Sequence, residues 1–189
     1  ASECRMPLCY GGGIKSVEQI KKIISLGVEK ISISSQSILD PNLISEASLL
    51  VGNQSIVATL DIKTENGELL LFTHNGKIKV DKDPLALIRK LQKKGVGEIV
   101  INSISKEGTM SGFNSNLIDR IIKEIDVPLT IMGGAGSHKD IYQLFEKYGL
   151  LGAGVGSLFV FKGQFKAVLI NYPNDEEKES ILSGYRLNN

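Results

Sequence analysis

Residues 129–137 read Leu-Thr-Ile-Met-Gly-Gly-Ala-Gly-Ser, and residues 6–16 read Met-Pro-Leu-Cys-Tyr-Gly-Gly-Gly-Ile-Lys-Ser. In both stretches a short apolar run ends in adjacent glycines, and a serine then precedes a stretch with helical period. A second apolar run follows each helix and ends in small residues, Ser34-Ser35 in one case and Gly156-Ser157 in the other. This repeat predicts two equivalent strand–loop–helix–strand units whose glycine loops offer backbone amides to an anion. Two such sites suit a ligand with a phosphate at each end.

Short apolar runs alternate with amphipathic stretches along most of the chain, which separates strands from helices by their hydrophobic period. Expected strands occupy residues 6–10, 30–33, 55–63, 98–101, 129–132 and 152–155. Expected helices begin at residue 17 and stop at Gly27, and further ones occupy residues 41–50, 83–94, 114–125 and 139–147. Residues 68–73, followed by Asn75-Gly76, predict a hairpin excursion. The segment after residue 155 predicts a weaker, partly helical tail.

The alternation of short strands and helices is typical of a parallel sheet with right-handed crossovers. The glycines in the loops after the strands favour a (β/α)8 TIM barrel, whose active site lies at the carboxyl ends of the strands. Such a barrel needs eight units and about 250 residues, whereas this chain has six candidate barrel strands in 189 residues. Residues 1–5 also read like the end of a helix. We therefore expect one α/β barrel domain over residues 1–189 that lacks the first two βα units.

Composition limits the class of partner. Lys and Arg number 22 and Asp and Glu 21, for a net charge of +1, so no overall field favours nucleic acid or a membrane surface. No apolar run approaches the ~20 residues of a membrane span, and no signal peptide opens the chain, which predicts a soluble cytoplasmic protein. Cys4 and Cys9 form no metal-binding pattern, and Cys9 in its apolar run predicts a buried free thiol. No metal or organic cofactor is expected.

Asp61 is the best catalytic candidate, since it closes an otherwise apolar strand near its carboxyl end. A carboxylate there is either a general acid/base facing the barrel mouth or a cap for the next loop. The serines at the strand ends are either hydroxyl donors to phosphate or simple caps. The loop 108–112 either covers a substrate or merely connects a strand to a helix. Lys30 and Glu98, at the opening ends of two strands, predict a stabilising salt bridge.

Five motifs together resemble the cyclase subunit of imidazole glycerol phosphate synthase. They are Tyr-Gly-Gly-Gly-Ile at 10–14, Lys-Ile-Ser-Ile-Ser at 30–34, Thr-Leu-Asp-Ile-Lys at 59–63, Gly-Thr-Met-Ser-Gly at 108–112 and Gly-Gly-Ala-Gly at 133–136. The hairpin at 67–73 is similar to an insertion after the family's fifth strand. The resemblance extends to about Phe161 and implies a (β/α)8 barrel built from two similar halves, of which this chain holds strands three to eight.

The resemblance also implies an activity. The family takes ammonia from a glutaminase partner, with which it forms a heterodimer, and uses it to cleave and cyclise a bisphosphate. The products are imidazole glycerol phosphate and an aminoimidazole carboxamide ribotide. Of the family's two acid/base aspartates, Asp61 matches the one on strand five, and the other would lie before Ala1.

Further residues match the family's functional positions. Gly13, Ser34 and Ser35 fall on one phosphate site, and Gly108, Gly134 and Ser157 fall on the other; Lys30 and Glu98 match the charged gate through which ammonia enters; Glu29 and Gln54 fall near the glutaminase surface. This implication replaces the purely stabilising role expected for Lys30 and Glu98.

Departures from the family pattern keep other functions open. The serine pair stands where the family more often has Asn-Thr, one acidic position is lost at Ser105 while another is conservatively kept at Glu107, and Met132 replaces a serine. Together with residues 7–10 these changes favour a paralogous branch that supplies ammonia for amidination of bacterial surface sugars. A bisphosphate isomerase of the sibling barrel family is disfavoured by the hairpin and by the Lys30–Glu98 pair. A non-catalytic scaffold that docks a glutaminase is a third alternative.

Overall fold

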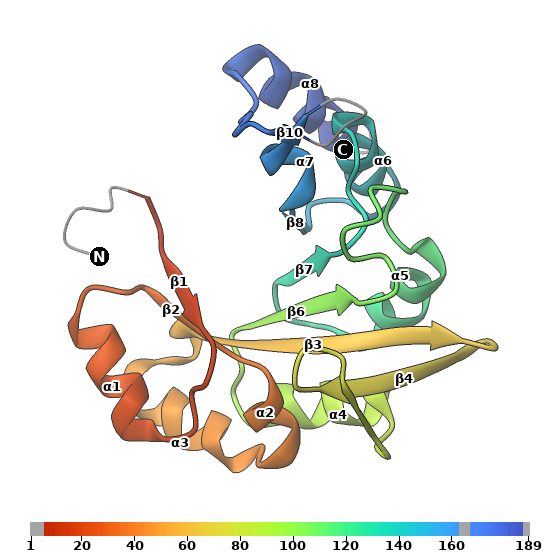
Figure 1. The fold of residues 1–189 in the computed structure, drawn as a ribbon. Coiled ribbons are helices and arrows are strands. Elements are labelled where there is room, and N and C mark those ends of the chain that lie inside the picture. The colour runs from red at the N-terminus through yellow and green to blue at the C-terminus, as the bar shows by residue number, and fades with distance from the viewer. Residues whose placement is uncertain (1–5, 163–166, 187–189) are drawn as a thin grey trace.

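The computed structural model describes residues 6–162 and 167–186, and its centre is a curved parallel sheet of six strands (Figure 1). In sheet order the strands are β1 (Cys9–Gly11), β2 (Lys30–Ile33), β3 (Ile56–Glu65), β6 (Glu98–Ser103), β7 (Leu129–Met132) and β8 (Gly152–Gly154). Each of these strands pairs in parallel with the next. The predicted α/β class and the six parallel strands are confirmed.

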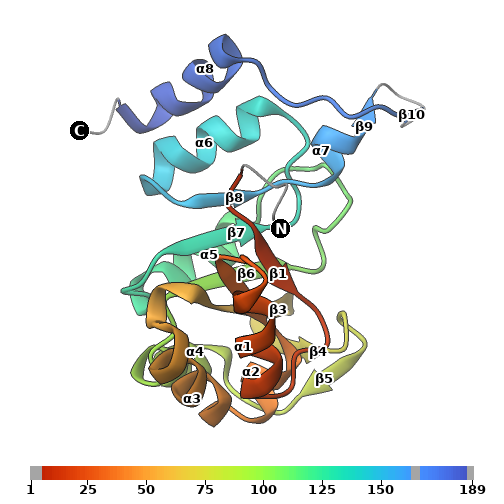
Figure 2. The same ribbon diagram turned by 90° about the vertical axis from the view of Figure 1, so that its left-hand side faces the viewer.

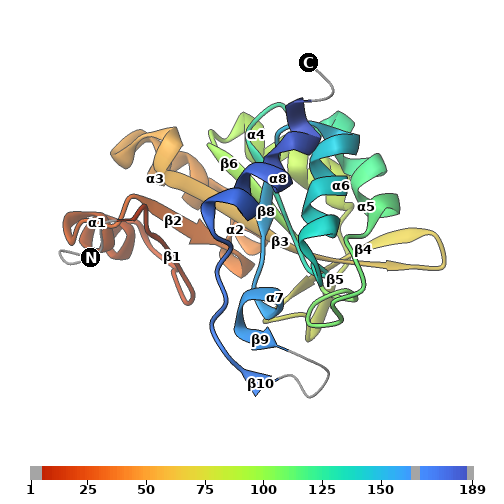
Figure 3. The same cartoon turned by 90° about the horizontal axis from the view of Figure 1, so that it is seen from above.

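The sheet is open in the described residues, because β1 and β8 end its strand order and do not pair with each other. Seen from above, helices lie along the outer, convex side of the curved sheet (Figure 3). We call the concave side, between β1 and β8, the inner face. The helices after the strands are α1 (Val17–Ser25), α2 (Ser35–Leu39), α3 (Asn42–Val51), α4 (Pro84–Lys93), α5 (Ser115–Ile121) and α6 (His138–Tyr148). This is the wall of a part-barrel of the expected type.

Helix caps explain the serines of the repeat. Ser16 begins α1 and its side chain accepts a hydrogen bond from the Gln19 amide. Ser137 begins α6 in the same way and completes a capping box with Asp140. Capping satisfies amide groups that the first helical turn leaves unpaired, so each serine fixes the residue at which its helix begins. The glycine loops before them are thereby held between a strand end and a fixed helix start.

The strand pattern sorts side chains onto two faces. On the outer face, isoleucine and leucine side chains are buried under the helices, and the core includes Ile31, Ile33, Ala58, Leu60, Ile62, Ile99, Ile101, Leu129 and Ile131. The alternate positions face the inner side of the curve, and many of them are polar. The burial of the outer aliphatic layer against the helices stabilises the wall, since each fully buried side chain contributes roughly 1.5–3 kcal/mol.

A hairpin extends one strand beyond the barrel wall. The last five residues of β3 pair with β4 (Glu68–Thr73), which in turn pairs with β5 (Ile78–Val80). The predicted hairpin excursion is confirmed. Because β3 runs to Glu65, it is longer than the expected strand 55–63 and projects past its neighbours.

Three local predictions were wrong or incomplete. The first strand covers only Cys9–Gly11, because it pairs with β2 over three residues and with no strand on its other side in the described part. Cys9 is exposed rather than buried for the same reason. The expected helix 114–125 is α5, capped by Asn114, followed by the 3-10 turn η2 (Ile122–Glu124), and a second such turn, η1 (Asn53–Ser55), precedes β3. The α2 helix was not predicted. Cys4 lies outside the described residues.

After β8 the chain forms α7 (Ser157–Val160), β9 (Phe161–Lys162), β10 (Ala167–Val168) and α8 (Asp175–Arg186). Helix α8 packs along α6, as Figure 2 shows. In residues 6–162 and 167–186, no helix has both the length and the apolar character needed to cross a bilayer.

Candidate functional site

One row of residues crosses the carboxyl edge of three neighbouring strands. Asp61 of β3 is in register with Asn102 of β6, and Asn102 is in register with Met132 of β7. Strand β7 ends at Met132, in this row, and β6 ends at Ser103, one residue beyond it. Asp61 therefore stands at the mouth of the part-barrel even though its own strand continues into the hairpin.

Asp61 is held as a buried carboxylate, with 7% of its surface exposed. Its Oδ1 accepts a hydrogen bond of 2.9 Å from Asn102 Nδ2. Within the described residues its Oδ2 has no hydrogen-bond partner. One oxygen of this carboxylate is therefore anchored, and the other is left available to a group at the mouth.

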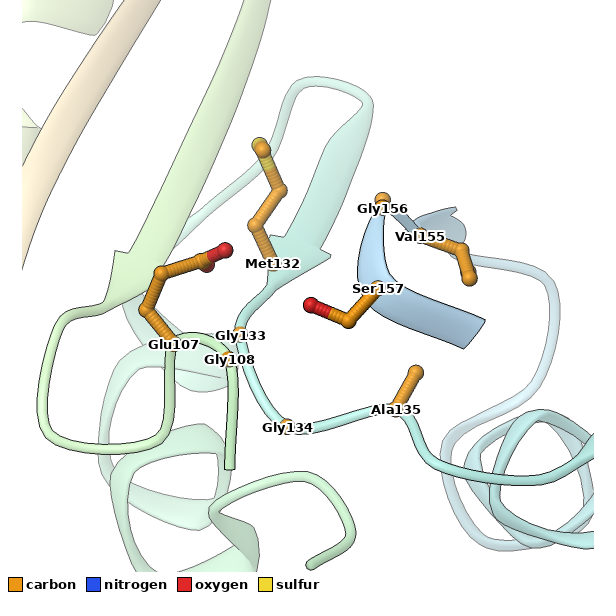
Figure 4. Close-up of a pocket in the computed structure, with 10 residues that line it drawn as sticks. Glu107, Gly108, Met132, Gly133, Gly134, Ala135, Val155, Gly156 and Ser157 are labelled. Carbon is orange, nitrogen blue, oxygen red and sulfur yellow. The ribbon is translucent and has the colours of Figure 1, made fainter. Parts of the chain in front are cut away.

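The second glycine loop lines a small pocket of about 110 Å³ beside this row. Its walls come from the loops after three strands, as Figure 4 shows: Gly108 follows β6, Gly133 and Gly134 follow β7, and Ser157 follows β8. The Ser157 hydroxyl points toward the loop that contains Gly133 and Gly134 (Figure 4). The three residues expected at this phosphate site are thus brought together.

Backbone geometry explains why this loop contains glycines. Gly133 has φ +90° and Gly134 has φ +110°, a region that side chains disfavour. A Cβ on Gly134 would overlap the carbonyl of Gly112, and the Gly112 amide donates to the Gly134 carbonyl at 2.8 Å. In the described part of the chain, the amides of Gly134 and Ala135 donate to no protein acceptor. Such amides are the donors that an anion would use.

The loop 108–112 lies against the pocket and is internally tied. Thr109 Oγ1 donates to the Lys106 carbonyl at 2.8 Å, and Lys106 Nζ donates to Ser111 Oγ at 3.0 Å. Met110 has a positive φ of +54°, a backbone conformation that costs free energy for a residue other than glycine. The Glu107 carboxylate lines the pocket next to Gly108 and points toward Met132 (Figure 4). One carboxylate and one thioether therefore share the pocket with the amides.

The first glycine loop is built differently. Gly12 (φ +113°) and Gly13 (φ +69°) are exposed, and no atom lies within 4 Å of where their Cβ atoms would be. Ser34 and Ser35 follow the neighbouring strand β2. Ser35 Oγ accepts a hydrogen bond of 3.1 Å from the amide of His74, at the hairpin turn after β4. The residues expected at this site lie on adjacent strand ends, with the hairpin bound to one of them.

The opposite end of the inner face carries an ion pair. Lys30 Nζ and Glu98 Oε2 are 2.6 Å apart, and Glu98 Oε1 also accepts a hydrogen bond of 2.8 Å from Thr130 Oγ1. The Glu98 side chain is 16% exposed and that of Lys30 is 43% exposed. The predicted salt bridge is confirmed. Glu29 and Gln54, which precede β2 and β3, are exposed at this same end of the strands.

Polar side chains continue along the inner face between the two ends. Ser32 Oγ and Thr59 Oγ1 are 2.6 Å apart. Ser32 lies two residues after Lys30 on β2, and Thr59 lies two residues after Val57 on β3. Thr59 in turn lies two residues before Asp61, so all these side chains share the inner face. Sequence reasoning missed Asn102, Thr130 and this hydroxyl pair. The signal was present as polar residues at every second position, but only the strand register reveals their contacts.

A metal site is not among the arrangements found. Within residues 6–162 and 167–186, no three His, Cys, Asp or Glu side chains are grouped so that they could hold a metal ion. The polar groups described at this mouth are a carboxylate, an amide, hydroxyls and backbone N–H groups.

Comparisons with a family model and with individual proteins point to the same family. Residues 1–166 match the family model described as histidine biosynthesis protein. A Vibrio vulnificus protein named "Putative imidazole glycerol phosphate synthase subunit hisF3" is 48% identical over 184 residues, which cover 96% of this chain and 71% of that protein. A Leptospira interrogans protein, "Putative imidazole glycerol phosphate synthase subunit HisF", is 46% identical over 186 residues, or 96% and 72% of the two chains. The Limosilactobacillus fermentum "Imidazole glycerol phosphate synthase subunit HisF" is 35% identical over 159 residues, or 83% and 61%.

Proposed function

Because this chain belongs to the histidine biosynthesis protein family, we propose that it is the ammonia-using cyclase subunit of an imidazole glycerol phosphate synthase. In this proposal, it forms imidazole glycerol phosphate and an aminoimidazole carboxamide ribotide from a bisphosphate, with ammonia supplied by a glutaminase partner. The observation that carries the proposal is the position of Asp61, buried between two glycine loops on the face that also bears the Lys30–Glu98 pair.

The glycine loops would bind the two phosphates of the substrate. Gly108, Gly134 and Ser157 supply amides and a hydroxyl at one site, and Gly13, Ser34 and Ser35 supply them at the other. Backbone donors fixed by strand ends and capped helices need no reorganisation when the anion binds. Binding at both ends would stretch the reacting centre across the mouth, next to Asp61.

Asp61 would act as general acid/base. Its free Oδ2 is the atom that takes or returns a proton, while its Oδ1 stays on Asn102. The resemblance assigns a second acid/base aspartate to a position before Ala1. Turnover should therefore be measured on the protein expressed from its complete gene.

Ammonia would enter at the Lys30–Glu98 end and travel along the inner face. Thr130, whose proton is donated to Glu98, can accept a hydrogen bond from ammonia. In the Ser32–Thr59 pair one hydroxyl donates to the other, so both oxygens can accept from ammonia and one proton is left to donate to its lone pair. These contacts would guide a small neutral nucleophile toward Asp61. The exposed Glu29 and Gln54 support docking of a glutaminase at this same end.

The first test is turnover of the bisphosphate with ammonium, in the wild type and in Asp61→Asn. Loss of turnover in a folded variant supports the assignment, and Asp119→Asn, an exposed carboxylate on α5, is the matched control. Retained turnover in Asp61→Asn would overturn it. For the ammonia route, Lys30→Ala should lower glutamine-driven turnover more than ammonium-driven turnover. The control there is Arg89→Ala, which removes an outer-surface ion pair with Glu124.

One observation favours a second function. Four relatives with 43–48% identity carry names that begin with "Putative", and four others, named without that word, are 33–36% identical. Met132 also lines the phosphate pocket where the resemblance implies a serine. The methionine in place of that serine supports a paralogous subunit that supplies ammonia for amidination of surface sugars. A folded protein that activates a glutaminase but does not turn over the bisphosphate would favour that function.

A further inference from the structure

We propose that Asn102 is a positioning residue that fixes the carboxylate of Asp61 for proton transfer. The two residues face each other across the β3–β6 ladder, and Asn102 Nδ2 donates to Asp61 Oδ1 at 2.9 Å. The inference rests on the proposed role of Asp61 as general acid/base. It adds a residue that no sequence motif above singled out.

The orientation of the Asn102 amide is set by Asp61 alone. The other end of the amide, Oδ1, is buried and has no hydrogen-bond partner in the described part of the chain. If the amide were reversed, its oxygen would face a carboxylate oxygen, and two acceptors repel. Only one orientation is therefore attractive, and it directs a donor at Asp61.

A buried, unpaired amide oxygen costs stability. Two residues before Asn102, on the same inner face of β6, Val100 is buried, so an aliphatic side chain is compatible with this face. An aliphatic residue at 102 would avoid the unpaired oxygen and lose only the bond to Asp61. A chain that keeps the amide despite this cost is consistent with a functional use of that one bond.

The consequence for Asp61 is a division of labour between its oxygens. Oδ1 is tied to Asn102, so rotation of the carboxyl group about its last torsion is restricted. Oδ2 is left without a partner in the described residues and is the oxygen that a ligand at the mouth would meet. Holding a reacting atom in one orientation raises the rate because less motion must be frozen in the transition state.

The first test reads the contact without any turnover. Protein labelled with ¹³C-aspartate gives a carboxyl resonance for Asp61, identified by its loss in Asp61→Asn. We expect Asn102→Leu, which is close in volume but has no donor, to shift this resonance, while those of Asp119 and Asp140 stay in place. Ser103→Ala is the matched control, because it removes a buried unpaired hydroxyl from the next residue of β6.

The outcomes distinguish two roles of Asn102: positioning the Asp61 carboxylate, or only supporting the folded structure. An unmoved Asp61 resonance in folded Asn102→Leu would overturn the proposal. If Asn102→Leu does not fold, Asn102→Ala replaces it, and failure of both to fold would assign Asn102 to the framework and likewise overturn the proposal.

The second test is kinetic and uses the protein expressed from its complete gene, with ammonium supplied. Asn102→Leu should lower kcat at least tenfold, in line with the effect of a misplaced catalytic group, and leave KM for the bisphosphate within about twofold. A raised KM with unchanged kcat would contradict positioning. Failure of the proposed function is seen separately, as turnover that survives Asp61→Asn, and it leaves the carboxyl resonance result standing.

Discussion

The two glycine loops come from the same sequence pattern but occupy different surroundings. Around Gly134, neighbouring loops close in: the residue is buried, a Cβ would overlap Gly112, and a pocket of about 110 Å³ results. Around Gly13 there is open space on an exposed edge. Both residues have positive φ, so both need glycine for conformation, but only Gly134 also needs it for room.

The difference follows from the sheet. The second loop lies between β6, β7 and β8, so loops on both sides cover it, whereas the first follows β1, which has a neighbour on one side only in the described residues. A repeated motif therefore fixes backbone shape, and the number of neighbouring strands decides whether that shape becomes a walled site. Four predictions test this contrast, beginning with the largest effect.

The 189-residue chain on its own should be inactive and poorly soluble, unless another copy or other strands cover the open edges of its sheet. The unpaired edges of β1 and β8 in the described sheet, and the open inner face between them, are free to bind other strands. Size-exclusion chromatography with light scattering measures the state of association. A monodisperse monomer with full cyclase turnover would contradict this prediction.

Gly134→Ala should destabilise the protein far more than Gly13→Ala. Both place a side chain at positive φ, which costs about 1–2 kcal/mol, but Gly134→Ala adds a clash with backbone that overpacking data put at about 1–3 kcal/mol more. Urea denaturation gives the two free energies of unfolding. Equal losses would mean that the second loop is as open as the first.

Ser35→Ala and Ser157→Ala should separate stability from binding. Ser35→Ala removes the acceptor of the His74 amide and should cost roughly 0.5–1.5 kcal/mol of stability. The Ser157 hydroxyl has no hydrogen bond in the described residues, so its loss should leave the midpoint of unfolding unchanged and weaken phosphate binding several-fold. Calorimetry with inorganic phosphate measures the second effect. If Ser157→Ala lowered the free energy of unfolding, the Ser157 hydroxyl would contribute to the stability of the fold, which contradicts this prediction.

Cys9 reports on the open edge through its reactivity. Partial desolvation on the inner face raises the pKa of its thiol, the Glu98 carboxylate raises it further, and Lys30 lowers it. Since the thiolate is the reactive form, Glu98→Gln should speed alkylation at pH 8 by about twofold to threefold, and Lys30→Ala should slow it. Rates are measured with iodoacetamide in a Cys4→Ser background. If neither substitution changed the alkylation rate, the Cys9 thiol would not be close to Glu98 and Lys30 on the inner face.

Much of the fold could be predicted because the hydrophobic period and the turn residues are local signals. The six parallel strands, the hairpin and the helix starts at Ser16 and Ser137 were all visible in the sequence. The exposure of Cys9 could not be predicted, because an apolar run predicts burial only when strands lie on both sides of it. Nor could α2, whose five residues are too few for a periodic pattern.

The site was predictable in its members but not in its contacts. Asp61 lies near the carboxyl end of an expected strand and the small residues follow the ends of others, so position along the chain was enough to select them. The partner of Asp61 depends on which residue of β6 lies opposite, and the sequence signal ended that strand at Ile101, one residue short of Asn102. The walls of the second pocket likewise require the approach of Gly112 to Gly134, two loops that are distant in sequence.

The central place of β3 has a consequence for amide hydrogen exchange. The segment around Asp61 is hydrogen-bonded to β6 on one edge and to β4 on the other, while Gly12 and Gly13 lie on an exposed loop beyond an edge strand. Amides of β3 and β6 should exchange only through global opening, and those of the first loop through local fluctuations of much lower free energy. Asp61, the proposed general acid/base, should thus belong to the slowest-exchanging part of the molecule, so that a loop could open to admit a ligand while this carboxylate stays in place.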